Sequence, residues 1–229
     1  MARTNDLRAA VRGAKQQLEA FEAWGVRDVP ALRRNASPAS SSEVWTRLER
    51  EVSTCTRCPL YRTATHPVFG DGHRRAKLVF VGEAPGRDED LQGRPFVGAA
   101  GKLLTKMIEA MGLKRDDVYI CNVLKHRPPQ NRLPEPDEVE ACRPYLLQQL
   151  ALIRPTVICT LGAVAARALL GPEVSIGHIR GQRQTFEGFT LIPTYHPAYL
   201  LRNPSAKRLV WEDLKHVMRL LKDADRKAS

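Results

Sequence analysis

Short runs of apolar, β-branched residues recur along the second part of the chain, and each run predicts a strand. These runs are 77–82 (KLVFVG), 118–124 (VYICNVL), 156–161 (TVICTL) and 189–194 (FTLIPT). Between and after them, apolar residues recur at spacings of three and four, which predicts helices. The helical segments are 101–111, 136–153, 163–170 and 205–221. Continuous apolar strands that alternate with helices are typical of an α/β fold, in which a mostly parallel sheet is covered on both faces.

The first 42 residues follow a different pattern. Residues 5–24 place Leu7, Val11 and Leu18 on one face of an amphipathic helix. The polar, Ser-rich stretch 33–42 contains Pro38 and is typical of a linker. We therefore predict an N-terminal helix and linker over 1–42 and a folded domain over 43–229.

Composition limits the classes of protein that need to be considered. With 229 residues, 43% of them hydrophobic and 27% charged, the chain can bury a core of one domain. It has no apolar run of about 18 residues, as a membrane helix needs. The N-terminus has no signal-peptide core, so we expect a cytoplasmic protein. A net charge of +11 fits a nucleic-acid partner, but an ordinary basic surface explains it equally well.

The unusual residues gather where the predicted strands end. In open α/β sheets, ligands bind outside the carboxyl ends of the strands. Those ends carry GEAPG (82–86), NVLKHRPPQNR (122–132), LG (161–162) and TYHPAYLLRNP (194–204). The glycines match neither a Walker A loop nor a dinucleotide fingerprint. We therefore look for a site other than a nucleotide phosphate loop at this edge.

Individual residues at these ends suit a site that binds a planar base. Glu83 and Asp90 can orient a water or stabilise a developing cation. Phe96, between a proline and a glycine, can stack on a base, although it can also be a core residue. Asn122 has a donor and an acceptor for the polar edge of a heterocycle, but asparagine is also common where strands end.

Two further segments have the chemistry of nucleic-acid contacts. Lys125, Arg127 and Arg132 form a basic loop suited to phosphates, or simply a solvated one. The segment Leu200-Leu201-Arg202, which follows His196, can wedge into a base stack or staple the last helix to the domain.

The five cysteines of the chain suggest a metal site rather than disulfides. Cys55 and Cys58 form a C-x-x-C pair in a polar loop, and Cys142 and Cys159 follow at a distance. Four thiolates can hold zinc or an iron–sulfur cluster, and the spacing does not separate these alternatives. The other interpretation is that Cys121 and Cys159 are small core residues.

Taken together, these residues resemble the family 4 uracil-DNA glycosylases, the iron–sulfur class found in bacteria and archaea. The resemblance covers most of the chain, from about Cys55 to Leu221. It is carried by CTRCPLY (55–61), VFVGEAPGRDEDLQGRPFVGAAGKLL (79–104), CNVLKHRPPQNRLPEPDEVEACRPYL (121–146), ICTLGAVAARALLG (158–171) and HPAYLLRNP (196–204).

The resemblance implies a three-layer α/β/α sandwich with a four-stranded, mostly parallel sheet. It also implies a structural 4Fe-4S cluster, which would anchor loops that touch the DNA backbone. Its ligands would be Cys55, Cys58, Cys142 and Cys159, which leaves Cys121 out.

For the site, the resemblance implies a uracil pocket and a set of DNA contacts. Phe96 would stack on the flipped uracil, Asn122 would pair with its N3–H/O4 edge, and His196 would stabilise the departing uracil anion through O2. Glu83 and Asp90 would orient water or support the sugar cation. The remaining implied residues are Gly82 and Gly86 in the pocket, and Lys125, Arg127, Arg132, Leu200, Leu201 and Arg202 against DNA.

The chain departs from the family at a few positions. Arg87-Asp88 stands where acidic residues or glutamine are common, His126 replaces a residue that is often cysteine, and Ala198 follows His-Pro where distant relatives carry serine. None of these removes an expected catalytic group. We therefore expect a monomeric, monofunctional enzyme that releases uracil from DNA and leaves an abasic site. The rival hypothesis is a non-catalytic four-cysteine module that binds nucleic acid.

Overall fold

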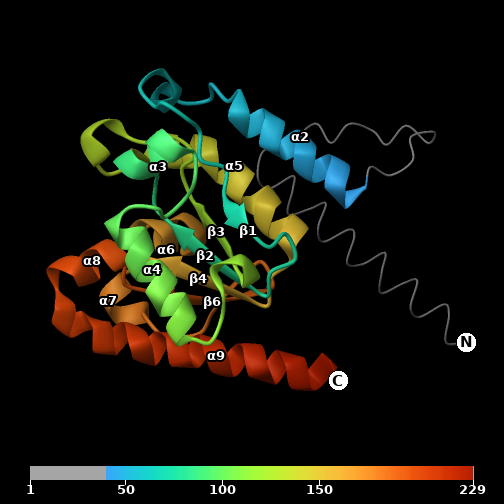
Figure 1. Ribbon diagram of the computed structural model, residues 1–229, viewed down its shortest axis with the longest axis vertical. Helices are drawn as coiled ribbons and strands as arrows, with labels where there is room; N and C mark the ends of the chain where they lie inside the picture. Colours follow the sequence, from blue (N-terminus) through green and yellow to red (C-terminus); the bar gives the residue numbers. More distant parts are fainter. Residues whose placement is uncertain (1–39, 229) are drawn as a thin grey trace, which may run out of the picture. The chain divides into compact units, whose positions relative to one another are not determined.

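The computed structural model describes residues 40–228 (Figure 1). Its core is one six-stranded sheet with the order β1-β3-β2-β4-β6-β5. The strands are β1 (Asp71–Gly72), β2 (Leu78–Gly82), β3 (Tyr119–Asn122), β4 (Val157–Leu161), β5 (Gln184–Phe186) and β6 (Phe189–Thr194). The four central strands β3, β2, β4 and β6 are parallel to their neighbours, and β1 and β5 pair antiparallel at the two edges.

The four predicted strands are confirmed as the parallel centre of this sheet, but the expected total of four strands was wrong. The two additional strands are short and partly exposed at the edges. They have no continuous apolar run, so the pattern that predicts buried strands did not reveal them.

Two helices have the ranges predicted from the apolar spacing, α5 (Pro136–Ile153) and α6 (Ala163–Leu170). The predicted range of α4 (Ala99–Ala110) was one or two residues off at each end, whereas α9 (Lys207–Ala228) begins two residues later and ends seven residues later than predicted. The helices not predicted are α2 (Ser41–Ser53), α3 (Arg87–Gln92), α7 (Ile176–Ile179) and α8 (Pro197–Arg202). Short 3-10 turns are η1 (Pro59–Arg62), η2 (Arg115–Asp117), η3 (Pro129–Asn131) and η4 (Pro204–Ala206).

Helices cover both faces of the sheet, as Figure 1 shows for α4 and α9 on one side and α5 on the other. Side chains alternate along a strand, so each strand contributes to both apolar layers. In β4, Cys159 packs with Leu104 of α4 and Leu214 of α9. Its neighbour Ile158 packs with Leu146 of α5. The three-layer α/β/α prediction is therefore confirmed.

The order of the strands determines where a ligand can bind. β2 and β4 are neighbours at the centre of the sheet. After β2 the chain continues to β3, on the side of β2 away from β4, and after β4 it continues to β6, on the side of β4 away from β2. The connections thus diverge between β2 and β4, and ligands bind in the crevice outside the carboxyl ends at such a point.

The predicted helix over 5–24 lies outside the described residues. The first described helix, α2, begins at Ser41, close to the end of the predicted linker. Among the described residues, no helix is long and apolar enough to cross a membrane.

Candidate functional site

Gly82, Asn122 and Phe96 converge at the carboxyl ends of β2 and β3. The parallel register pairs Gly82 with Asn122. A Cβ atom at position 82 would overlap the Asn122 amide and would lie 2.6 Å from the Phe96 ring. Only glycine permits so close an approach of the ring and the amide to the strand.

The Asn122 side chain is buried, and its amide oxygen has no hydrogen-bond partner among the described residues. Asn122 is 1% exposed, and its Oδ1 accepts no hydrogen bond from any described residue. An unsatisfied buried polar atom costs about 1–3 kcal/mol. The site therefore holds a polar atom ready for a ligand that brings its own hydrogen-bond partner.

Glu89 holds the loop that carries Phe96. Its Oε1 accepts the backbone N–H groups of Val97 and Gly98 at 2.8 and 2.9 Å, and its Oε2 accepts that of Gly86 at 3.1 Å. Phe96 has φ of 52°, an uncommon backbone conformation for a bulky residue. The Glu89 carboxylate thus stabilises a loop conformation that is unfavourable for the backbone of Phe96.

The sequence pattern did not single out Glu89, which lies within the charged run 87–90. A signal was available in the spacing of Gly86 and Glu89 at the start of α3, which is typical of a helix-capping glutamate.

His196 lies next to Phe96 and is neutral near pH 7. The two ring centroids are 5.6 Å apart. The backbone N–H of Ala198 donates to Nδ1 at 3.1 Å, so the neutral ring carries its proton on Nε2. Burial, reinforced by the charge of Arg202, lowers the pKa of His196 to about 4, although Glu89 opposes this shift. The imidazole is therefore a hydrogen-bond donor without a positive charge.

The two predicted catalytic carboxylates have different surroundings. Glu83 follows Gly82 directly, and its carboxylate makes no hydrogen bond with a described residue. Burial raises the pKa of Glu83. Asp90 is 3% exposed and accepts hydrogen bonds from the backbone and hydroxyl of Thr65 at 2.8 and 2.9 Å. Glu83 is thus available to a ligand. Asp90, which lies in α3, instead binds the turn around Thr65 and holds that turn (the Thr65 turn) against the helix.

Lys125 does not have the exposed position that a phosphate contact requires. We expected it on the DNA face, but its side chain is fully buried. Its ammonium donates to the backbone carbonyl of Asn122 at 2.9 Å and to Gln149 at 2.7 Å. Gln149 in turn donates to Tyr119 and to the carbonyl of Phe69. The expectation was wrong because partners far along the sequence enclose this lysine.

The other predicted DNA contacts divide between surface and core. Leu201 is 47% exposed and Arg202 lies beside it at the surface, whereas Leu200 is 1% exposed and belongs to the core. The expectation that Leu200 touches DNA was therefore wrong. Arg127 donates to Asn131, and the exposed Arg132 forms a double hydrogen bond with the buried carboxylate of Glu138.

Three of the four predicted cysteine ligands lie in one region. Cys55, Cys58 and Cys142 pack in the same apolar cluster, between α2 and α5. The backbone N–H of Lys125 donates to Cys142 Sγ at 3.2 Å. Cys159 packs on the opposite face of the sheet against α4 and α9, so the structure does not bring it to the other three. Cys121 lies in the core beside α5.

Within residues 40–228, no group of three or more His, Cys, Asp or Glu side chains is placed to hold a metal ion.

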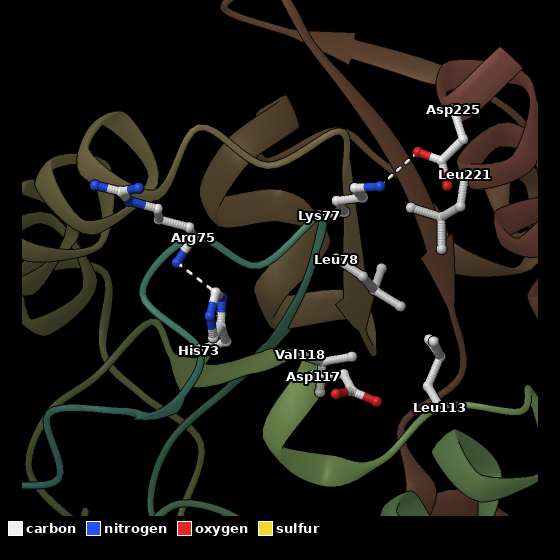
Figure 2. Close-up of a pocket in the computed structure, with 9 residues that line it drawn as sticks. All are labelled: His73, Arg75, Lys77, Leu78, Leu113, Asp117, Val118, Leu221 and Asp225. Atoms are coloured by element: carbon white, nitrogen blue, oxygen red, sulfur yellow. Dashed lines mark hydrogen bonds and ion pairs between the residues drawn. The ribbon is translucent and has the colours of Figure 1, made fainter. Parts of the chain in front are cut away.

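A cavity of about 360 Å³ is present, but it lies at the other end of the sheet. Figure 2 shows it beside Lys77 and Leu78 at the start of β2, with Leu221 and Asp225 of α9. It is therefore separate from the residues at the carboxyl ends of the strands.

Comparisons with known proteins identify the family of the chain. The model of the uracil DNA glycosylase superfamily matches residues 69–215. The chain is 47% identical to a type-4 uracil-DNA glycosylase of Thermotoga maritima, over 76% of this chain and 93% of that protein. It is 48% identical to a type-4 uracil-DNA glycosylase of Archaeoglobus fulgidus, over 73% of this chain and 88% of that protein. A type-5 uracil-DNA glycosylase of Pyrobaculum aerophilum is 31% identical, over 72% of this chain and 86% of that protein.

Proposed function

Because this chain belongs to the uracil-DNA glycosylase superfamily and, within it, to the type-4 enzymes, we propose that it hydrolyses the N-glycosidic bond of deoxyuridine in DNA repair. The product is free uracil and an abasic site. The observation that carries this proposal is the buried, unpaired Asn122 amide beside the Phe96 ring.

Asn122 and Phe96 account for the choice of base. Uracil offers an N3–H donor and an O4 acceptor, which match the acceptor and donor of one amide. Cytosine offers an acceptor at N3, so it would leave Asn122 Oδ1 buried and unpaired. A site built to hydrogen-bond its substrate rejects an analogue that lacks the partner group. The Phe96 ring supplies the apolar face on which the base stacks.

His196 stabilises the leaving group. When the bond between N1 and C1′ breaks, the electron pair leaves with uracil, and negative charge spreads to O2. A neutral imidazole that donates from Nε2 can bind this oxygen without a protonation step, since Nδ1 is occupied by the Ala198 N–H. The pKa of about 4 keeps the ring in this form throughout the neutral range.

Glu83 serves the other half of the reaction. Its carboxylate can accept a proton from the water that attacks C1′, and its charge can support the cation-like sugar. The raised pKa, caused by burial, makes it a better base than an exposed carboxylate. Asp90 acts indirectly, by holding the Thr65 turn against α3.

The enzyme is monofunctional in this proposal. A lyase step needs an amine that attacks C1′, and the lysine nearest to Asn122 in sequence, Lys125, is buried with its ammonium bonded to Asn122 O and Gln149. Water is therefore the nucleophile.

DNA binds across the carboxyl ends of the strands, with the target nucleotide flipped out of the stack. Flipping costs a few kcal/mol, and a side chain that fills the gap repays part of that cost. Leu201 and Arg202 are placed to do so, because they are exposed on α8, directly after His196. Arg127, in the loop after β3, supplies positive charge for the phosphates, whereas the charge of Arg132 is paired with Glu138 until DNA competes for it.

Cys55, Cys58 and Cys142 would hold an iron–sulfur cluster. The donor set fits, because the three thiols share one apolar cluster and Cys142 Sγ already accepts a backbone N–H, as cluster sulfurs do. Each thiolate of such a cluster binds a different iron, so the ligands need not converge on one ion. When bound, the cluster would supply a structural link between the 55–58 loop, α5 and the segment after β3.

The test is a single-turnover assay with an oligonucleotide that contains one uracil, followed by alkaline cleavage. We expect strand cleavage at the uracil and none with thymine or cytosine at that position. Binding without cleavage would overturn the enzyme proposal in favour of a non-catalytic nucleic-acid-binding module. Cleavage before alkali is added would contradict the monofunctional mechanism.

A further inference from the structure

We propose that His126 supplies the fourth protein ligand of the iron–sulfur cluster, through an imidazole nitrogen, so that the set is three cysteines and one histidine. This inference rests on the cluster in the proposed function and names a ligand that neither the cysteine count nor the family resemblance assigns. The observation that prompts it is that three thiols lie together without a fourth.

The sheet keeps Cys159 away from this group. In β4 the odd positions Val157, Cys159 and Leu161 face α4 and α9, and Ile158 faces α5. Cys142 lies on α5, on the opposite face. β4 is hydrogen-bonded in parallel register to β2 and β6 on its two sides, which fixes the face on which each of its side chains lies. Cys159 therefore stays in the core.

The backbone places His126 beside the segments that carry the other ligands. The N–H of the preceding residue, Lys125, donates to Cys142 Sγ at 3.2 Å. The carbonyl of Lys125 accepts the N–H of Val68 at 2.7 Å. Val68 lies ten residues after Cys58, in the stretch between η1 and β1. Position 126 is thus tied on one side to the helix of Cys142 and on the other to the chain that follows Cys58.

The side chain of His126 is buried and without a hydrogen bond. It is 6% exposed, and no nitrogen of its ring bonds to any of residues 40–228. The ring of His196 accepts the Ala198 N–H, and His66 and His216 bond backbone carbonyls. A buried imidazole normally finds a partner. A metal ion satisfies one of its nitrogens, and neutral imidazole is a common ligand of iron.

The proposal has an electronic consequence. Replacing one thiolate by a neutral imidazole makes the cluster less negative by one charge, and histidine ligation raises the potential of the iron–sulfur centres in which it occurs. The His126→Cys variant should therefore keep the cluster but have a lower reduction potential than the parent protein.

The experiment uses the full chain purified without oxygen, with histidine labelled with ¹⁴N or ¹⁵N. Iron and sulfide are measured first, and the cluster is then reduced and examined by pulsed EPR for nitrogen coupling. The variants are His126→Cys, His126→Ala and Cys159→Ala. His66→Ala is the matched control, because His66 lies in the adjacent Thr65 turn and bonds the carbonyl of Asp90.

We expect a strong nitrogen coupling that follows the histidine label, is lost in His126→Cys and persists in the His66 and Cys159 variants. His126→Ala should lose iron. A four-iron cluster with no histidine coupling, or one that is lost on Cys159→Ala and kept in His126→Ala, would overturn the ligand assignment alone. A protein without iron and sulfide would overturn the cluster itself, and the uracil assay tests the enzyme function independently of both.

Discussion

The buried ammonium of Lys125 donates a hydrogen bond to the backbone carbonyl of Asn122 at 2.9 Å. The proposed base-reading residue is therefore anchored by a charge inside the core. Burial lowers the pKa of this lysine. Its second bond, to Gln149 at 2.7 Å, links the segment after β3 to α5. The conformation of the pocket thus depends on a polar network beneath it.

Lys125→Met should destabilise the protein. The change leaves the Asn122 carbonyl and the Gln149 amide oxygen without this donor in the core, and an unsatisfied buried polar group costs about 1–3 kcal/mol. Chemical denaturation would measure the free energy of unfolding. The exposed Lys102→Met variant is the control and should have the stability of the parent. Equal stability of both variants would mean that the network contributes nothing.

Asn122→Ala should lower single-turnover uracil excision by about 100-fold, since each lost hydrogen bond to the transition state costs about 1–3 kcal/mol. The stability should change little or increase, because an unpaired buried oxygen is removed. Excision at the parental rate would exclude the recognition role of Asn122.

Glu89→Ala should impair substrate binding without touching the reacting atoms. Three backbone N–H groups lose their acceptor, so the Phe96 loop is expected to relax from its uncommon conformation. We expect KM to rise about tenfold, equivalent to about 1.4 kcal/mol. Glu109→Ala, an exposed change on α4, is the control. A fall in kcat with constant KM would instead place Glu89 in the chemical step.

His196 should make the fold less stable in acid. Its pKa is lowered from 6.5 to about 4, so between these values the unfolded chain binds a proton that the folded chain does not. Stability therefore falls as the pH decreases from about 6.5 to about 4, by on the order of 3 kcal/mol. Below pH 4 both states are protonated and the loss is complete. In His196→Gln, the slope of unfolding free energy against pH should be smaller over this window; an unchanged slope would contradict the assignment.

Leu200 and Leu201 should respond differently to truncation. Leu200→Ala creates a cavity in the core and should cost about 2–5 kcal/mol of stability. Leu201→Ala removes an exposed side chain and should leave the stability unchanged, while excision from duplex DNA falls more than excision from single strands. A duplex rate equal to that of the parent would remove Leu201 from the flipping mechanism.

The sequence predicted the centre of the sheet well because four runs are apolar throughout and lie buried between helices. The edge strands β1 and β5 were missed because they are short and half-exposed. The convergence of Gly82 and Asn122 followed from their places at the ends of neighbouring strands, whereas Phe96 lies in the loop between α3 and α4 and was placed in the pocket by the family resemblance. Lys125 was misplaced because its partner Gln149 comes from α5, and a basic loop pattern contains no information on such a contact.

The sequence pattern alone could have predicted that Cys159 lies apart from the other cysteines. It falls inside a predicted strand, and alternation along that strand separates it from Ile158. Applying the alternation to the ligand set would have shown that a cysteine of this strand need not face the others. His126 was noted as a departure, but its burial depends on contacts that only the folded chain reveals.

The exposed ion pair between Lys77 and Asp225, visible in Figure 2, lies where the last turns of α9 pass the start of β2. The proposed pocket lies at the other end of that strand, roughly 16 Å away at about 3.3 Å per residue. A fluorescent label or surface tether attached through the end of α9 would therefore leave the DNA face open. This makes the helix a practical handle for observing single molecules of the protein on DNA.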